Sequence, residues 1–313
     1  MTAISLTEVS AHYGTVKSLD DISFSVEAGG RVGLVGESGS GKSTLCRLLV
    51  GLRTPSSGEL TVFERPVSDY LARDARLFRR TVQLIMQDAV ASLSPRMRIR
   101  NLLREAIPIH ALPVEETWSW IETLTTRLGL SKSIYDRYPH EVSGGQARRL
   151  AIIRALALRP RIVIADEPTA GLDVSVQGGL LNLLIEIQKE LSLTYLMISH
   201  DLRVIRRVTD RVMVMYLGEI VEDGETEALF RKPAHPYSVA LLSTGAAHAP
   251  NQAVQPIILQ GEIPSAINPP PGCRFHTRCP VAKTLCKTDP PPLRRLPENR
   301  SVRCHFPYSL SFA

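Results

Sequence analysis

Apolar residues recur along the chain in two different patterns. Residues 6–9 and 22–26 alternate apolar and polar positions, and this period of two predicts short antiparallel strands. Residues 31–35 are almost continuously apolar, which predicts a buried strand, and residues 45–49 predict a helix directly after it. Similar strand patterns occupy residues 59–63, 81–86, 161–165 and 194–199. Strands and helices mixed in this way predict an α/β fold.

The pattern changes at about residue 88, where prolines begin to separate short helical pieces such as 114–121. A longer helical pattern follows at 147–158, so we expect an inserted helical subdomain over about 88–158. Proline triplets at 269–271 and 290–292 predict irregular, extended structure near the end of the chain. The sequence therefore predicts one large domain, residues 1–248, and an irregular C-terminal extension, residues 249–313.

A glycine-rich segment joins the strand at 31–35 to the helix at 45–49, and it fits the P-loop pattern. Its residues are Gly36, Glu37, Ser38, Gly39, Ser40, Gly41, Lys42, Ser43 and Thr44. Glycines let successive backbone N–H groups turn toward one point, and the start of a helix adds the positive end of its dipole. Phosphate groups are the expected ligand. Lys42 can reach the outer phosphates, and the Ser43 hydroxyl is suited to Mg²⁺.

Two acidic residues end the strand predicted at 161–165. In a P-loop protein, Asp166 at this position is expected to help hold Mg²⁺. The next residue, Glu167, is then placed to orient or deprotonate an attacking water. His200 follows the strand at 194–199 and could contact a γ-phosphate, although a lone histidine at a strand end is usually incidental.

Two further patterns stay open when they are considered separately. Tyr13 lies upstream of the P-loop, where its ring could stack on an adenine or simply pack against the protein. The helix at 147–158 is preceded by Ser143, Gly144, Gly145 and Gln146. This start gives the helix a cap and bare N–H groups, which suit either an anion site or an ordinary capped helix.

Composition is that of a globular protein, with 44% hydrophobic and 22% charged residues. The net charge of +6 allows nucleic acid or an anionic membrane as neighbours, but the basic residues form only short clusters that are typical of solvated helix faces. No apolar run approaches the roughly 20 residues of a membrane span, and the first residues lack a signal-peptide layout, so we expect a cytosolic location.

Four of the five cysteines lie in the C-terminal extension, at Cys273, Cys279, Cys286 and Cys304. Four thiolates suit a metal ion or an iron–sulfur cluster. Their spacing is not the paired pattern of ordinary zinc ribbons. Free buried thiols, which behave as small hydrophobic groups, are the alternative.

Together these motifs resemble the ATP-binding subunit of an ATP-binding cassette (ABC) transporter over residues 5–240. The resemblance implies that Tyr13 stacks on adenine, that Gln87 is the Q-loop glutamine and a Mg²⁺ ligand beside Ser43 and Asp166, and that His200 is the switch histidine. It also implies that Glu167 is the catalytic base and that Asp173 lies in the D-loop at a dimer interface. Residues 143–146 match the signature sequence, which contacts the ATP held by a partner cassette.

Details inside and outside the motifs are similar to the branch that imports oligopeptides, dipeptides and nickel. They include residues 86–97, the lead into the signature at 138–141, residues 235–242 and the cysteine pattern of the extension. Some members of this branch carry a [4Fe–4S] cluster in such an extension, so the resemblance favours a cluster on the four cysteines.

The resemblance implies a subunit that hydrolyses ATP, with Mg²⁺, to energise the import of peptides, nickel or a related small solute. The implied partners are two membrane permease subunits, a second ABC ATPase in a heterodimer or a homodimer and, indirectly, an extracytoplasmic solute-binding protein, with no nucleic acid. The chain would then lie at the cytoplasmic face of the inner membrane as a peripheral protein. The alternative is a soluble ABC ATPase that acts on ribosomes or nucleic acid.

Overall fold

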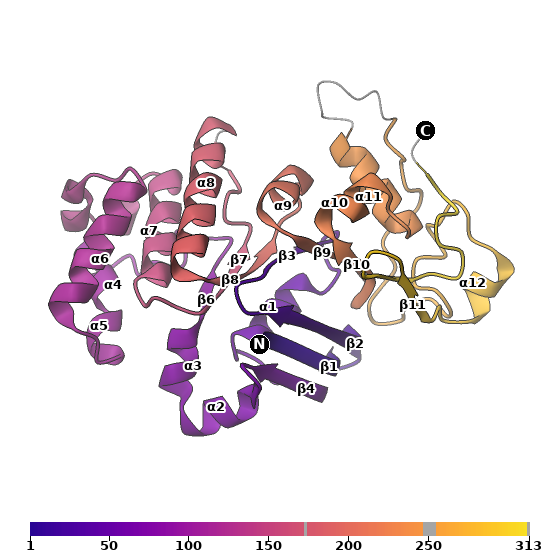
Figure 1. Cartoon of the computed structure of the whole chain (residues 1–313), viewed down its shortest axis with the longest axis horizontal. Coiled ribbons are helices and arrows are strands. Elements are labelled where there is room, and N and C mark those ends of the chain that lie inside the picture. The colour runs from indigo at the N-terminus through magenta and orange to yellow at the C-terminus, as the bar shows by residue number, and fades with distance from the viewer. Residues whose placement is uncertain (172–173, 247–254, 312–313) are drawn as a thin grey trace.

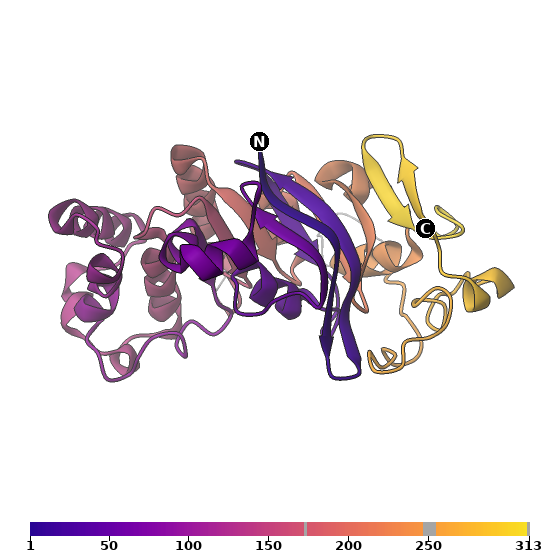
Figure 2. The same ribbon diagram turned by 90° about the horizontal axis from the view of Figure 1, so that it is seen from below.

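The computed structural model describes residues 1–171, 174–246 and 255–311. Its first sheet is antiparallel, with strand order β2-β1-β4-β5. This sheet forms a separate layer that contains the N-terminus (Figures 1 and 2). The strands are β1 (Thr2–Tyr13), β2 (Val16–Glu27), β4 (Ser57–Val62) and β5 (Arg65–Pro66). The alternating apolar pattern at residues 6–9 and 22–26 lies within β1 and β2, as the sequence predicts.

The second sheet forms the centre of the molecule and is mainly parallel. Its parallel part, in spatial order, is β6 (Val82–Ile85), β7 (Ile162–Asp166), β8 (Thr194–Ile198), β3 (Arg31–Val35) and β9 (Arg211–Tyr216). The strands β7 and β8 are buried along nearly their whole length, which explains their continuous apolar sequences. The predicted α/β fold is confirmed.

Side chains alternate between the two faces of this sheet and so divide the core in two. On β8, Leu196 and Ile198 pack with the helix α1 (Lys42–Leu49) and the antiparallel sheet. Their neighbours Tyr195 and Met197 point to the other face, where the helices α8 (Val174–Leu191) and α9 (Leu202–Val208) cover the sheet. The helix α1 is therefore held between two sheets, and this fixes the loop that precedes it.

A group of helices extends the molecule at the end of the sheet nearest β6 (Figure 1). They are α4 (Ile99–Arg104), α5 (Ala106–Ile109), α6 (Val114–Arg127) and α7 (Gly144–Leu156). Buried leucines and isoleucines join α6 to α7, and the Trp120 indole donates a hydrogen bond of 3.0 Å to the Leu156 carbonyl. These helices lie within residues 88–158, where the sequence analysis expects a helical subdomain. Among the described residues, no helix combines the length and apolar character that crossing a membrane requires.

The C-terminal extension is largely irregular, with the short helix α12 (Thr284–Thr288) and a hairpin of β11 (Leu293–Leu296) and β12 (Arg300–Arg303). The hairpin lies at the side of the molecule opposite the helical subdomain (Figure 2). There β12 pairs with β10 (Glu219–Glu225), which itself pairs with β9, so the last strands complete the edge of the central sheet.

A buried ion pair fixes this junction. The Arg300 side chain is 3% exposed, and its Nη2 lies 2.7 Å from Oε1 of Glu222, which is fully buried. The Glu222 carboxylate also accepts hydrogen bonds from the backbone N–H groups of Ala234 and His235, at 2.8 and 2.9 Å. These N–H groups lie just before the helix α11 (Pro236–Ala246). One carboxylate thus joins the sheet, the extension and α11.

Replacing Arg300 with Ala would leave the Glu222 carboxylate buried without its guanidinium, and breaking such a pair costs about 3–5 kcal/mol. We expect Arg300→Ala to lower the free energy of unfolding by about this amount in chemical denaturation. The matched control is Arg231→Ala, because Arg231 pairs with Glu298 at 3.3 Å with both side chains more than half exposed, and such pairs contribute only about 0–1 kcal/mol. Equal effects of the two substitutions would contradict the assignment.

Candidate nucleotide site

The predicted P-loop joins β3 to α1, as its sequence requires. Gly36 has a φ of 156°, and a Cβ there would lie 2.2 Å from the Met215 carbonyl oxygen on the neighbouring strand. Gly41 caps α1 with a φ of 110°, and a Cβ there would lie 2.6 Å from the Ser18 carbonyl oxygen. Only glycine avoids both the strained backbone and the collision at these two positions.

Lys42 lies inside the curve of this loop. Its ammonium donates hydrogen bonds to the carbonyl oxygens of Gly36 and Glu37, at 2.8 and 2.7 Å, and to Oγ of Ser40 at 3.2 Å. Burial lowers the pKa of Lys42, while the nearby carboxylates of Asp166 and Glu167 act in the opposite direction. The loop therefore carries a positive charge at its centre, where phosphate oxygens would bind.

A cavity of about 600 Å³ opens beside the loop, within the size range of small-molecule sites. Most of the residues that the sequence analysis singled out line it. They are Gly36, Ser38, Gly39, Gly41, Lys42, Ser43, Thr44, Gln87, Asp166, Glu167 and His200, together with Val16, Ser18 and Ala266. Four of the segments that the sequence analysis singled out, at 36–44, 87, 166–167 and 200, thus meet at one surface.

Asp166 ends β7, and Glu167 follows it in a left-handed conformation with a φ of 52°. Burial raises the pKa of the Asp166 carboxyl, and the charge of Glu167 raises it further, whereas the Lys42 ammonium lowers it. Two adjacent carboxylates at the cavity wall create a site that favours a cation.

His200 contacts Glu167 directly. The Nδ1 atom of its ring lies 2.5 Å from Oε1 of Glu167, and its backbone N–H donates to the same oxygen at 3.1 Å. The Glu167 side chain is only 10% exposed, while the His200 side chain is 73% exposed. The histidine therefore orients the carboxylate while much of its own ring faces the solvent.

Arg148 is a residue of this site that the sequence analysis did not single out. It lies on α7, and its guanidinium donates to the Glu167 carbonyl oxygen at 2.6 Å and to the Gln87 carbonyl oxygen at 3.0 Å. It therefore links the helical subdomain to the backbone of both segments. The only sequence signal was a charged residue that interrupts the apolar positions of this helix.

Tyr13 is not among the residues that line the cavity. The Arg53 guanidinium lies over its ring, 3.6 Å from the centroid, and Arg47 donates to its hydroxyl at 3.4 Å. The Tyr13 side chain is exposed, so stacking on adenine stays a prediction.

The predicted signature forms the start of α7 rather than a wall of the cavity. Ser143 Oγ accepts a hydrogen bond from the Gln146 backbone, and Gln146 Oε1 accepts one from the Ser143 backbone, at 3.2 and 3.0 Å. This reciprocal cap leaves Gly144 exposed, with nothing within 4 Å of where a Cβ would be. Contact with a partner's ATP stays a prediction. Asp173 lies outside the described residues.

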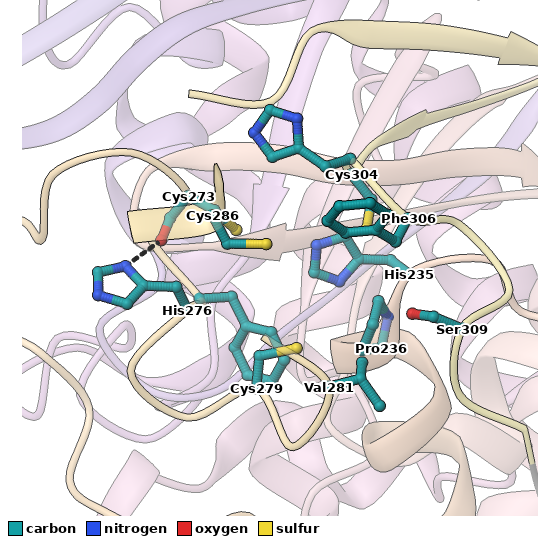
Figure 3. Close-up of a pocket in the computed structure, with 12 residues that line it drawn as sticks. His235, Pro236, Cys273, His276, Cys279, Val281, Cys286, Cys304, Phe306 and Ser309 are labelled. Atoms are coloured by element: carbon teal, nitrogen blue, oxygen red, sulfur yellow. Dashed lines mark hydrogen bonds between the residues drawn. The ribbon is translucent and has the colours of Figure 1, made fainter. Parts of the chain in front are cut away.

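The four cysteines of the extension line one small cavity, together with buried His235 and with Phe306 (Figure 3). All four are free thiols, and burial raises the pKa of Cys273, Cys279 and Cys304 to about 11. Across the described ranges, no three His, Cys, Asp or Glu side chains are arranged to hold a metal ion.

Comparisons with known proteins identify the family of the chain. Residues 19–170 match the family model for ABC transporters, and residues 221–286 match that for the oligopeptide/dipeptide transporter C-terminal region. The oligopeptide transport ATP-binding protein AppF of Bacillus subtilis is 44% identical over 94% of this chain and 90% of its own. The di/tripeptide transport ATP-binding protein DppF of Pseudomonas aeruginosa is 43% identical over 94% of this chain and 91% of its own.

Solved structures extend the comparison. A component of an ABC transporter complex from Clostridium perfringens has a TM-score of 0.66 and 28% identity, and it covers 74% of this chain and 91% of its own. A dimeric ATP-binding cassette in a post-hydrolysis state, with bound ADP and phosphate, has a TM-score of 0.64 and 25% identity over 71% of this chain and 98% of its own.

A P-loop beside paired acids defines a nucleoside triphosphatase, and the ordered motifs narrow it to an ABC ATPase. The chain belongs to the ATP-binding subunits of ABC transporters, in the oligopeptide/dipeptide branch. It binds and hydrolyses ATP.

The contact between Glu167 and His200 generates a prediction for catalysis. We expect Glu167→Gln to leave ATP binding intact and to lower kcat by at least about 10²-fold, because the amide cannot accept a proton from water. Steady-state hydrolysis and equilibrium ATP binding, both measured on the full chain with its co-purified partners, test this. The control is Glu186→Gln on α8, where the side chain is 66% exposed and outside the cavity lining. Normal turnover in Glu167→Gln would refute the base assignment.

Proposed function

We propose that this subunit hydrolyses ATP to energise the import of peptides, or of a chemically related small solute. The carrying observation is that Glu167 and His200 are joined at the wall of the cavity beside the P-loop, within a chain whose relatives are peptide transport subunits. The cavity supports the ATPase activity. The relatives named for oligopeptides and for di- and tripeptides indicate the class of cargo. Nickel, the other cargo of the branch, has no support among these names.

Mg²⁺ would be held by the Ser43 hydroxyl, the Gln87 side chain and Asp166, all of which line the cavity. These three oxygen donors suit a hard cation, and the pKa of Asp166, raised partly by the adjacent Glu167 charge, indicates a place where added positive charge is favourable. Bound Mg²⁺ supplies charge neutralisation for the terminal phosphates. Lys42 would contact the same phosphates, Glu167 would accept the proton of the attacking water, and His200 would hold that carboxylate in place.

Productive hydrolysis would need a second ATPase subunit. Ser143 and Gly144, at the capped start of α7, are exposed and lie outside the cavity lining, so they are free to contact ATP bound by another chain. The dimeric cassette with 25% identity supports such an arrangement. The partner would be a similar subunit in a heterodimer or a second copy of this chain.

The remaining partners follow from the transporter class. Two membrane permease subunits would contact the helical subdomain, and an extracytoplasmic binding protein would select the cargo without touching this chain. We place the chain at the cytoplasmic face of the inner membrane as a peripheral subunit. We also propose that the chain divides into an ATPase domain, residues 1–248, and an extension, residues 249–313.

We further propose that the cysteine cavity holds a [4Fe–4S] cluster. The donor types support this proposal, because Cys273, Cys279, Cys286 and Cys304 line one cavity and are not joined in disulfides, although their sulfurs are not arranged around a single metal ion. Each thiolate of such a cluster binds a different iron, so the sulfurs need not converge on a single ion. Such a cluster supplies electron transfer or structural cross-linking.

Protein purified without oxygen is expected to contain about four iron and four sulfide ions per chain by chemical analysis, as the Cys₄ cluster type requires. A Cys286→Ser variant should lose much of this content, because Cys286 is one of the four thiols that line the cavity. The control is Cys46→Ser, which removes a buried thiol of α1 outside that cavity. Zinc without sulfide, or no metal in either protein, would contradict the cluster.

Cells that carry Glu167→Gln in place of the native chain should lose uptake of a radiolabelled tripeptide, because the ATPase can no longer reset the transporter. Uptake of radiolabelled nickel, measured in parallel, should be unchanged. Loss of nickel uptake alone would reassign the cargo. Normal uptake of both solutes in the variant cells, together with ATP hydrolysis by the native chain that added RNA stimulates, would favour the soluble nucleic-acid ATPase instead.

A further inference from the structure

The P-loop is held from outside by a residue of the C-terminal extension. The Arg278 guanidinium donates two hydrogen bonds to the Glu37 carboxylate, from Nη1 to Oε2 at 2.6 Å and from Nη2 to Oε1 at 3.1 Å. The Arg278 side chain is 8% exposed and the Glu37 side chain 29%, so the guanidinium is buried and the carboxylate is partly shielded from solvent. This bidentate geometry is the strongest form of an arginine–carboxylate contact.

The backbone of Glu37 is held as well. Its N–H donates to the Tyr237 hydroxyl of α11 at 2.8 Å, and its carbonyl oxygen accepts from the Lys42 ammonium at 2.7 Å. Three groups therefore fix one residue of the loop, and one of them is the lysine that reaches the phosphates. Two of the three lie C-terminal to the last parallel strand, β9.

The position of Arg278 is itself well defined. Phe275, three residues earlier, packs against the rings of Tyr216 and Tyr237, with centroids 5.2 and 5.4 Å apart. Cys279, the next residue, lines the cysteine cavity. The hydrogen bonds to Glu37 raise the pKa of Arg278, which is charged at any accessible pH. A rigid aromatic cluster on one side and the cysteine cavity on the other thus set where this guanidinium lies.

A second part of the extension reaches the same site, because Ala266 is among the residues that line the nucleotide cavity. The extension is therefore not confined to the edge of the sheet. It contacts the outer side of the P-loop through Arg278 and the wall of the cavity through Ala266.

We propose that the C-terminal extension is part of the ATP-binding machinery, with Arg278 as a positioning residue that sets the conformation of the P-loop through Glu37. Loss of the pair removes the side-chain restraint on Glu37 and leaves only the two backbone contacts, so the Glu37 carbonyl positions the Lys42 ammonium less firmly. The expected result is weaker binding of nucleotides that carry β- and γ-phosphates. This inference depends on ATP binding alone and not on the cargo or on a cluster.

The test uses the full chain in the Glu167→Gln background, so that ATP persists, and measures the Kd of a fluorescent ATP analogue. We expect Arg278→Ala to raise Kd at least about tenfold, and Arg278→Lys to recover only part of the loss, because an ammonium cannot form the two parallel bonds. In the turnover-competent chain, the same substitution should raise KM more than it lowers kcat.

The matched control is Arg303→Ala. Arg303 also joins the extension to the ATPase domain, at 3.4 Å from Asp21, but does not touch the P-loop. It should leave Kd unchanged. If Arg278→Ala prevents folding, Glu37→Gln tests the same pair, because it keeps the side-chain size and removes the charge.

A double-substitution cycle with Glu37→Ala and Arg278→Ala completes the test. Non-additive effects on Kd are expected, since each change alone removes the same interaction. An unchanged Kd in both Arg278→Ala and Glu37→Gln would overturn the proposal, as would an equal loss in Arg303→Ala, which would reduce the pair to an anchor for the extension.

Discussion

The placement of one partly buried ammonium, that of Lys42, is the constraint on which the nucleotide site depends. Burial disfavours its charge, and the surrounding chain offsets this through hydrogen-bond acceptors, the carbonyls of Gly36 and Glu37, and through the nearby negative charges of Asp166 and Glu167. Those acceptors stay in place only because α1 is held between the two sheets and because Gly36 passes against the Met215 carbonyl. The fold thus holds the positive charge of Lys42 where a phosphate group can bind it.

The same fold joins the candidate site to distant segments. Glu167 is oriented by His200 through its carboxylate and by Arg148 through its backbone carbonyl. Arg148 belongs to α7 and also contacts the Gln87 carbonyl. A movement of the helical subdomain would therefore displace the backbone at both Glu167 and Gln87. The helical subdomain is therefore physically linked to the residues beside the cavity.

The sequence predicts the fold and much of the site because their signals are local. Each signal occupies a few consecutive residues of recognisable chemistry. The signals are the P-loop, the buried strand followed by two acidic residues, and the capped helix start at Ser143. Arg148 and Arg278 lack such a signal, because each acts on residues far away in the chain and neither periodicity nor spacing marks the pairing. The contact between Tyr13 and Arg53 could not be predicted for the same reason, because Arg53 follows α1 and is distant from Tyr13 in the sequence.

The separation of Glu37 and Arg278 also bears on the order in which the protein is made. The two partners are 241 residues apart, so at roughly 5–20 residues per second the arginine leaves the ribosome about 10–50 s after the glutamate. During that interval the nascent chain has its complete P-loop, but the Glu37 carboxylate still lacks Arg278 as its partner. Maturation of the nucleotide site is therefore a late event of synthesis, although its sequence motif is among the first to emerge.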